Sequence, residues 1–114
     1  MIERYTFGQI TIRGKTYTSD VIIHPDERVD DNWWRKEGHL LLPEDLEEVV
    51  KEKPDILIVG TGNSGLMEVP ASTKKWIESK GIKLIACPTK EACNIYNQLY
   101  KSGSRVTAAF HLTC

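Results

Sequence analysis

The sequence has little of several features that would assign a protein to a class at once. It has three cysteines in 114 residues, and an odd number without paired spacing predicts free thiols rather than a disulfide framework. No stretch approaches the roughly 18 apolar residues of a membrane-spanning helix, and residues 1–9 lack the apolar core of a signal peptide. The formal net charge is −1, without the basic surplus of a sequence-independent nucleic-acid binder. We therefore expect a cytoplasmic protein that binds neither membrane nor nucleic acid.

Metal and dinucleotide sites are also not expected. The three histidines and three cysteines show no metal-ligand spacing. Gly60, Gly62 and Gly65 match the spacing of a dinucleotide fingerprint, but Pro70 falls where the helix of that motif would run, at a cost of about 3 kcal/mol. The acidic residue that this motif needs at the end of the next strand is missing as well. No cofactor is predicted.

The most informative stretch is Pro54 to Gly65. Its apolar run Ile56–Val59 is continuous and rich in β-branched residues, which is typical of a parallel strand buried on both faces. The run stops at Gly60-Thr61-Gly62, so the chain turns there. With 40% hydrophobic and 27% charged residues, the composition is that of an ordinary globular protein, and the length predicts a single domain over 1–114.

The remaining pattern alternates helices and strands. Residues 5–23 predict a β-hairpin that turns at Arg13-Gly14. Helices are expected from Pro43 to about Lys51, from Pro70 to Gly81, and from Pro88-Thr89 to Ser102-Gly103, with Thr89 as the N-cap of the last. Buried strands are expected at 82–86 and 106–112. The alternation predicts an α/β fold in which 56–59, 82–86 and 106–112 are neighbouring, largely parallel strands.

Ligands gather at the carboxyl ends of strands in such sheets, which makes the loop after residue 59 the first candidate site. Successive amides of Gly60, Thr61, Gly62 and Asn63 could form an anion-binding nest, and the guanidinium of Arg35 would suit the same anion. The alternative is that the glycines only let the chain turn and pack closely.

Two further segments leave alternatives open. Trp33 and Trp34 either complete the core or accompany Arg35 and His39 at a cleft, where His39 would carry protons. Cys87 lies at a strand end just before a helix, a position that can activate a thiol, but a buried structural thiol fits the same pattern.

A specific combination of residues in the last third, together with the Gly60-Thr61-Gly62 strand end and Trp34-Arg35, resembles the Mth938-like domain family. The terminal His111-Leu112-Thr113-Cys114 is the most specific part of the resemblance, which covers essentially the whole chain. The other residues of the last third that carry the resemblance are Gly81-Ile82, Thr89, Ala92, Tyr96-Asn97, Leu99, Arg105-Val106 and Ala108-Ala109.

The resemblance implies a three-layer α/β fold with a mostly parallel central sheet and an additional β-hairpin layer. It also implies a crevice near Gly60, Thr61 and Gly62 with Arg35 as a neighbour, and it supplies no settled catalytic residues. The family includes an adipogenesis-associated protein and a mitochondrial assembly factor for respiratory complex I. Because residues 1–9 do not resemble a mitochondrial presequence, the cytosol is favoured over that assembly role.

Two hypotheses about function follow. The first is a binding or assembly module for an anionic ligand or a protein partner, which would use Trp33-Trp34 and the crevice. The second is a small enzyme that acts on an anionic substrate through Arg35, with His39 or Cys87 for proton transfer or attack. Exposed tryptophans would favour the first, and convergence of Arg35, His39 or Cys87 on one pocket would favour the second.

Overall fold

The apolar run that begins at Ile56 forms strand β6 (Ile56–Thr61), which lies inside a five-stranded sheet in the computed structural model of residues 1–114. β6 pairs in parallel with β7 (Lys83–Cys87) on one side and with β8 (Val106–His111) on the other. This arrangement confirms the prediction of three neighbouring parallel strands. Every residue of β6 after Ile56 is buried, as its continuous apolar pattern indicated. β7 is the exception among the expected buried strands, because it forms the edge of the sheet and is only half-buried.

The N-terminal strands divide between two sheets. A separate antiparallel sheet contains β1 (Ile2–Thr6), β2 (Gln9–Ile12) and β3 (Lys15–Tyr17), and the predicted turn at Arg13-Gly14 joins the last two. The prediction that the hairpin continues to Ile23 is wrong. β4 (Val21–Ile23) is buried at all three residues and pairs antiparallel with β8 and with β5 (Val29–Asp31). The five-stranded sheet, with the order β5-β4-β8-β6-β7, is therefore mixed. The pairs among β8, β6 and β7 are parallel, and the pairs that involve β4 are antiparallel.

Each helical segment starts at or just after a proline, as predicted. A 3-10 turn η1 (Pro43–Leu46) leads into α1 (Glu47–Lys51), Pro70 precedes α2 (Ala71–Ser79), and Pro88 precedes α3 (Thr89–Lys101). Because α2 begins at Ala71, the glycines after β6 lie outside any helix. Thr89 is not the N-cap of α3, since Pro88 holds that position and the Thr89 hydroxyl bonds elsewhere. No helix has the length and apolar composition needed to cross a membrane.

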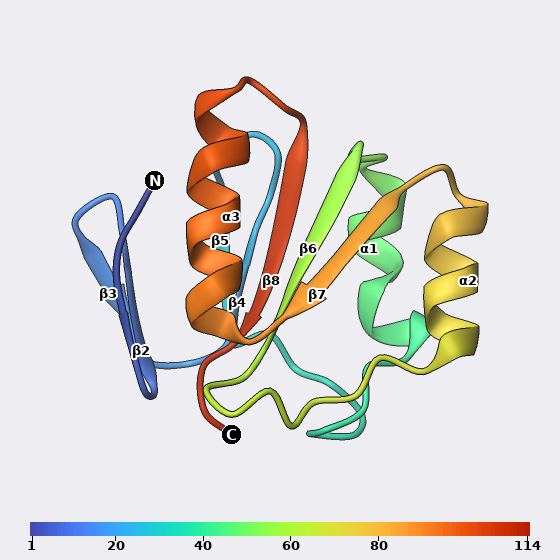
Figure 1. The fold of residues 1–114 in the computed structure, drawn as a ribbon, viewed down its shortest axis with the longest axis horizontal. Helices are drawn as coiled ribbons and strands as arrows, with labels where there is room; N and C mark the ends of the chain where they lie inside the picture. The colour runs from blue at the N-terminus through green and yellow to red at the C-terminus, as the bar shows by residue number, and fades with distance from the viewer.

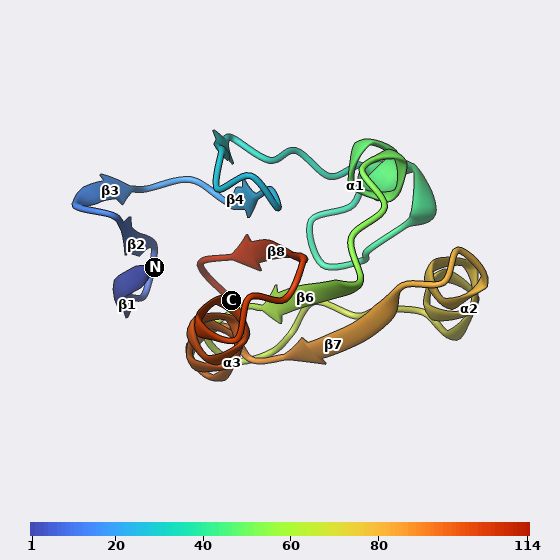
Figure 2. The same ribbon diagram turned by 90° about the horizontal axis from the view of Figure 1, so that it is seen from above.

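The elements form three layers, which confirm the predicted α/β class with an additional hairpin layer. Figure 2 shows α1 and α2 on one side of the five-stranded sheet, and α3 with the three-stranded sheet on the other. In Figure 1 the carboxyl ends of the parallel strands, the loop after β6, the β1–β2 turn and the C-terminus all lie at the lower end of the molecule. Candidate sites at the carboxyl ends are therefore enclosed by segments from both ends of the chain.

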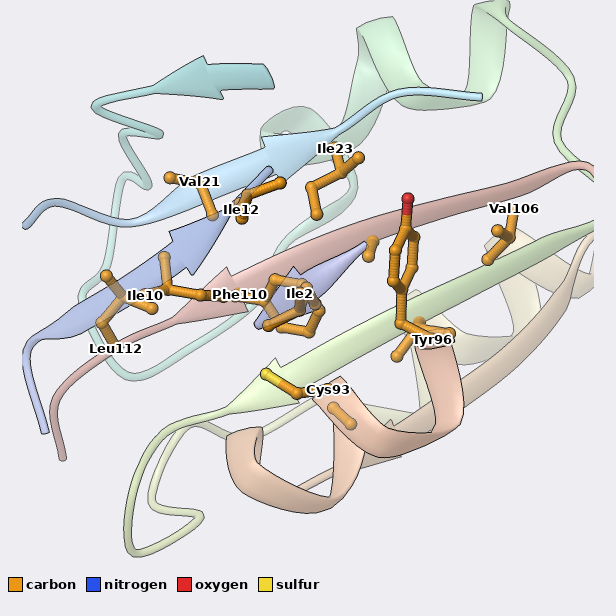
Figure 3. Packing of buried hydrophobic residues seen from close by; sticks show 13 residues of the cluster. Ile2, Ile10, Ile12, Val21, Ile23, Cys93, Tyr96, Val106, Phe110 and Leu112 are labelled. Carbon is orange, nitrogen blue, oxygen red and sulfur yellow. The ribbon is translucent and has the colours of Figure 1, made fainter. Parts of the chain in front are cut away.

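Two apolar cores hold the layers together. The first joins α3 and the three-stranded sheet to the central sheet, and Figure 3 shows Phe110 of β8 packed among Ile10, Cys93 and Tyr96. The second lies under α1 and α2 and includes Leu46, Val59 and Ile77. Alternate residues of β6 and β8 face the two cores, so Thr61 and His111 belong to the face covered by α1 and α2.

Candidate functional site

The backbone amides of the loop after β6 are already occupied by the chain itself. The Gly62 N–H donates to Oγ1 of Thr89 at 2.9 Å. The N–H of Asn63 donates to the carbonyl of Thr113, and those of Ser64 and Leu66 donate to the carbonyl of Cys114. The segment Thr113–Cys114 thus occupies the position that a bound anion would take in a nest.

The glycines of this loop allow close packing. A Cβ on Gly60 would lie 2.7 Å from Phe110 Cδ1 and 2.8 Å from Thr89 Oγ1. Gly62 has φ of +108°, and a Cβ there would lie 2.8 Å from the carbonyl oxygen of Thr113. Both glycines therefore meet the requirements of the packing alternative: Gly60 has no room for a side chain, and Gly62 has neither room nor a suitable φ.

Arg35 lies near the end of β6, but its charge is paired. Its Nη1 is 2.9 Å from Oδ2 of Asp20, and its Nε and Nη2 donate to the carbonyl of Gly38. The guanidinium also lies 4.7 Å from the centre of the Trp33 ring, a cation–π distance. Arg35 is only 9% exposed and lines none of the cavities, and its Nη1 has no hydrogen bond beyond the ion pair with Asp20. The guanidinium is thus enclosed by the chain in this structure.

Asp20 and His111 form a buried pair beside Arg35. Nδ1 of His111 is 2.8 Å from Oδ2 of Asp20 and 3.0 Å from Nη2 of Arg35. A ring nitrogen can donate to the carboxylate or accept from the guanidinium, and a proton on Nδ1 avoids placing two lone pairs in contact. Burial would raise the pKa of Asp20, but hydrogen bonds from His111 and from the Leu112 N–H, with the charge of Arg35, lower this pKa overall.

His111 points its second nitrogen into the protein without a partner. The side chain is 8% exposed, and its Nε2 has no hydrogen bond. Thr61 is its register partner on the same face of the sheet, and the exposed His39 meets its ring edge-on at 5.9 Å. Asp20, Arg35, His39, Thr61 and His111 thus make one polar group, which we call the edge cluster.

Cys87 does not join the edge cluster. It packs against the core on the α3 side of the sheet, where burial, and then the charge of Glu91, raise the pKa of its thiol. Those features agree with a structural thiol rather than an activated nucleophile. No group of three or more His, Cys, Asp or Glu side chains has the arrangement of a metal site.

A separate groove of about 530 Å³ lies between Trp33-Trp34 and α1. Ile22 and Val49 form apolar parts of its lining, and Trp34 is 76% exposed. Trp33 is half-buried against the core, so the core interpretation holds for Trp33 and fails for Trp34. The charged residues that line the groove are Lys36, Glu44, Asp45, Glu47 and Glu48.

Trp33 connects the groove to the edge cluster. Its ring lines the groove and also contacts the guanidinium of Arg35, while its Nε1 donates to the carbonyl of Asp45 at 3.3 Å. The Asp45 carboxylate accepts hydrogen bonds from the N–H groups of Lys36 and Leu42, which fixes the wall that carries Trp34. The groove is therefore a supported surface rather than a gap beside a loose loop.

A family model described as "Protein of unknown function (DUF498/DUF598)" matches residues 2–111. The chain belongs to the DUF498/DUF598 family. The conserved hypothetical protein PH1505 from Pyrococcus horikoshii OT3 is 33% identical, with a TM-score of 0.85 over 100% of this chain and 99% of that one. A structure titled MT938 is 34% identical, with a TM-score of 0.84 over 100% of this chain and 98% of that one.

A more distant match confirms the Mth938-like fold. A Bordetella pertussis protein, described as a Mth938-like domain, is 18% identical, with a TM-score of 0.71 over 98% of this chain and 85% of that one. The resemblance to Mth938-like domains that the sequence indicated is thus correct. The family description names no ligand and no activity for DUF498/DUF598 domains.

Sequence reasoning about this DUF498/DUF598 domain missed two members of the edge cluster. Asp20 stood in a segment interpreted as a hairpin strand, and His111 appeared only within the terminal motif. The two residues are 91 positions apart, so no local spacing could have paired them. A usable signal was a polar residue at one end of each of two buried strands. Asp20 directly precedes Val21 of β4, and His111 directly follows Phe110 in β8.

Proposed function

We propose that this DUF498/DUF598 domain is a protein-binding module whose groove receives a basic segment of a partner. The observation that carries the proposal is the 76% exposure of Trp34 at the edge of a groove with an apolar floor. Exposed tryptophan beside an apolar depression is a common anchor of protein interfaces, because its ring supplies a large contact area with few rotatable bonds.

The charges of the groove define the chemistry of the partner. Four carboxylates and one lysine line it, which leaves three negative charges in excess. Lys36 lies 4.0 Å from Glu44, so this cation is partly neutralised by the groove itself. A segment with lysine or arginine on either side of an apolar residue would match both the rim and the floor.

The experiment is a selection of random displayed peptides on the wild-type protein, followed by affinity measurements on Trp34→Ala. We expect enriched peptides to combine basic residues with an apolar anchor, and Trp34→Ala to weaken their binding by at least roughly tenfold. Leu66→Ala is the matched control, because Leu66 is also an exposed apolar residue, at 57%, but lies outside the groove. Peptides without basic residues, or equal binding by Trp34→Ala, would refute the proposal.

The enzymatic alternative rests on the edge cluster. Arg35 and His39 both lie next to His111, whose unpartnered Nε2 could accept a proton while Asp20 orients the ring. None of these side chains lines a cavity, which favours the binding module. A metabolite screen by thermal shift on wild type and His111→Gln tests this alternative, since a substrate of the edge cluster should stabilise only the wild type.

The remaining prediction from the sequence, an anion held by Arg35 and the loop Gly60–Asn63, requires displacement of Thr113–Cys114. The same thermal-shift screen tests this anion site if the metabolites include phosphates and carboxylates. An anion that stabilises the wild type and fails to stabilise Arg35→Gln would support this site.

A further inference from the structure

The outer edge of β7 is open for pairing with another strand. β7 ends the order β5-β4-β8-β6-β7, and Figure 2 shows it at the outer end of the sheet. Natural proteins block such edges with proline, bulges, inward-pointing charges or a covering segment. β7 reads Lys-Leu-Ile-Ala-Cys, pairs with β6 without an irregularity, and has its only charge at its first residue.

The free hydrogen-bonding groups of this edge can be assigned. The N–H of Lys83 donates to the carbonyl of Asp55, directly before β6. The backbone N–H and carbonyl of Lys83 therefore point toward β6. Backbone groups alternate along a strand, which turns those of Leu84 and Ala86 toward the outside. An incoming strand would therefore find two N–H groups and two carbonyl groups.

We propose that β7 pairs antiparallel with β7 of a second copy of this chain, with the two-fold axis at Ile85. Under this symmetry Leu84 of one copy lies opposite Ala86 of the other, and the outward groups of both complete four hydrogen bonds. The result is a continuous sheet of ten strands across the two molecules.

The charges at the edge favour a second copy in this register. Lys83 falls opposite Cys87 of the other molecule rather than opposite its own equivalent, so no like charges oppose each other. Glu91 lies in the first turn of α3, close enough to Cys87 to affect its thiol. The two-fold pairing thus brings the exposed Lys83 of each copy beside the exposed Glu91 of the other.

The apolar surface around β7 would be covered by the same pairing. Half-buried Leu84 and Ile85 lie on opposite faces of the strand, and the exposed Ala86 continues the face of Leu84. A shallow depression of about 410 Å³ adjoins them, lined also by Val69 and Lys74. At the two-fold axis the two Ile85 side chains meet at the short distance of a non-hydrogen-bonded pair.

The experiment is sedimentation velocity of the full chain from about 10 µM to about 1 mM, a range that brackets weak self-association. We expect the sedimentation coefficient of the wild type to rise to that of a dimer. Ala86→Pro removes an outward N–H that the dimer needs, so this variant should stay monomeric. It should still fold, because proline is tolerated in an edge strand. A wild type that stays monomeric throughout, or an Ala86→Pro variant that still dimerises, overturns the proposal.

A charge-reversal cycle tests the register independently and avoids any risk to folding. Lys83→Glu and Glu91→Lys each place like charges across the axis, and each should weaken the dimer by roughly tenfold, since two contacts are lost per dimer. The double variant restores opposite charges and should return the affinity to that of the wild type. Additive weakening in the double variant, or no effect of either single change, overturns this register and with it the proposal.

Discussion

Oδ2 of Asp20 lies 2.8 Å from Nδ1 of His111, although 91 residues separate them along the chain. The carboxylate thereby joins the start of β4 to the end of β8, and its second oxygen accepts the N–H of Leu112. Hydrogen bonds and the charge of Arg35 lower its pKa below the ordinary value of 3.8, against the effect of burial.

Asp20→Asn should lower the free energy of unfolding and make it depend less on pH in the acid range. A lowered carboxyl pKa adds stability above the ordinary value of 3.8, and this stability is lost as the pH falls through the folded value. We expect a loss of about 3 kcal/mol in the free energy of unfolding at pH 7, because Arg35 is left without its counter-charge. Urea denaturation at pH 7, 5, 4 and 3 measures it. A constant difference between the two proteins down to pH 3 would contradict this linkage.

Gly62→Ala should destabilise the fold far more than the same change at Gly14. Both residues have positive φ, +108° and +82°, but a Cβ on Gly14 meets nothing within 4 Å, while one on Gly62 meets Thr113 and Cys114. We expect the free energy of unfolding to fall by about 1 kcal/mol in Gly14→Ala and by roughly 3–5 kcal/mol in Gly62→Ala. Chemical denaturation midpoints compare them directly. Equal losses would mean that the C-terminal segment does not pack against Gly62 as described.

The three thiols should differ in their rates of alkylation. Burial, followed by the charge of Cys87, raises the pKa of Cys93 to about 12, and the thiolate is the reactive form. Cys87 and Cys114 are only half-buried. At pH 8 we expect Cys93 to react about a thousandfold more slowly than an ordinary thiol. Mass spectrometry of the native protein should find Cys93 unmodified, and the denatured, unreduced protein should give three modified thiols. Rapid labelling of native Cys93 would contradict its position in the core.

His24 should contribute to stability through two carboxylates at once. It is buried, its Nε2 lies 2.6 Å from Oδ2 of Asp30, and its Nδ1 contacts the Glu52 carboxylate. The ring therefore joins β4, β5 and the end of α1. His24→Ala should reduce the free energy of unfolding by about 3 kcal/mol, since both carboxylates lose their contact with the buried ring. The exposed His39 is the control, where alanine should cost less than about 0.5 kcal/mol. Similar losses at the two positions would refute this role of His24.

Local patterns predicted the elements of this fold well wherever burial and turn residues agreed. The continuous run Ile56–Val59 required a strand covered on both faces, and Pro70 and Gly81 bounded α2 closely. Val21–Ile23 was assigned to the wrong sheet because its sequence predicts a strand without naming a partner. Only the packing of β8 against it decides that the chain leaves the hairpin at this point.

The candidate site was harder to predict for a related physical reason. The amides of Gly62 and Asn63 looked free because their acceptors, Thr89 and Thr113, lie far along the chain. Arg35 was recognised as important, but its partner Asp20 is invisible to any local pattern. The exposure of Trp34 depends on how Asp45 fixes the preceding segment, which again is a tertiary effect.

The position of β8 has a consequence for synthesis on the ribosome. β8 is inserted between β4 and β6, although both of these strands are translated earlier. Until residues 106–111 have left the exit tunnel, the facing edges of β4 and β6 have no partner, and the apolar residues beside them remain exposed. The nascent chain must therefore wait for its final strand before the two halves of the sheet can join. This order predicts slow folding, because contacts between distant parts of the chain must form before the sheet is complete.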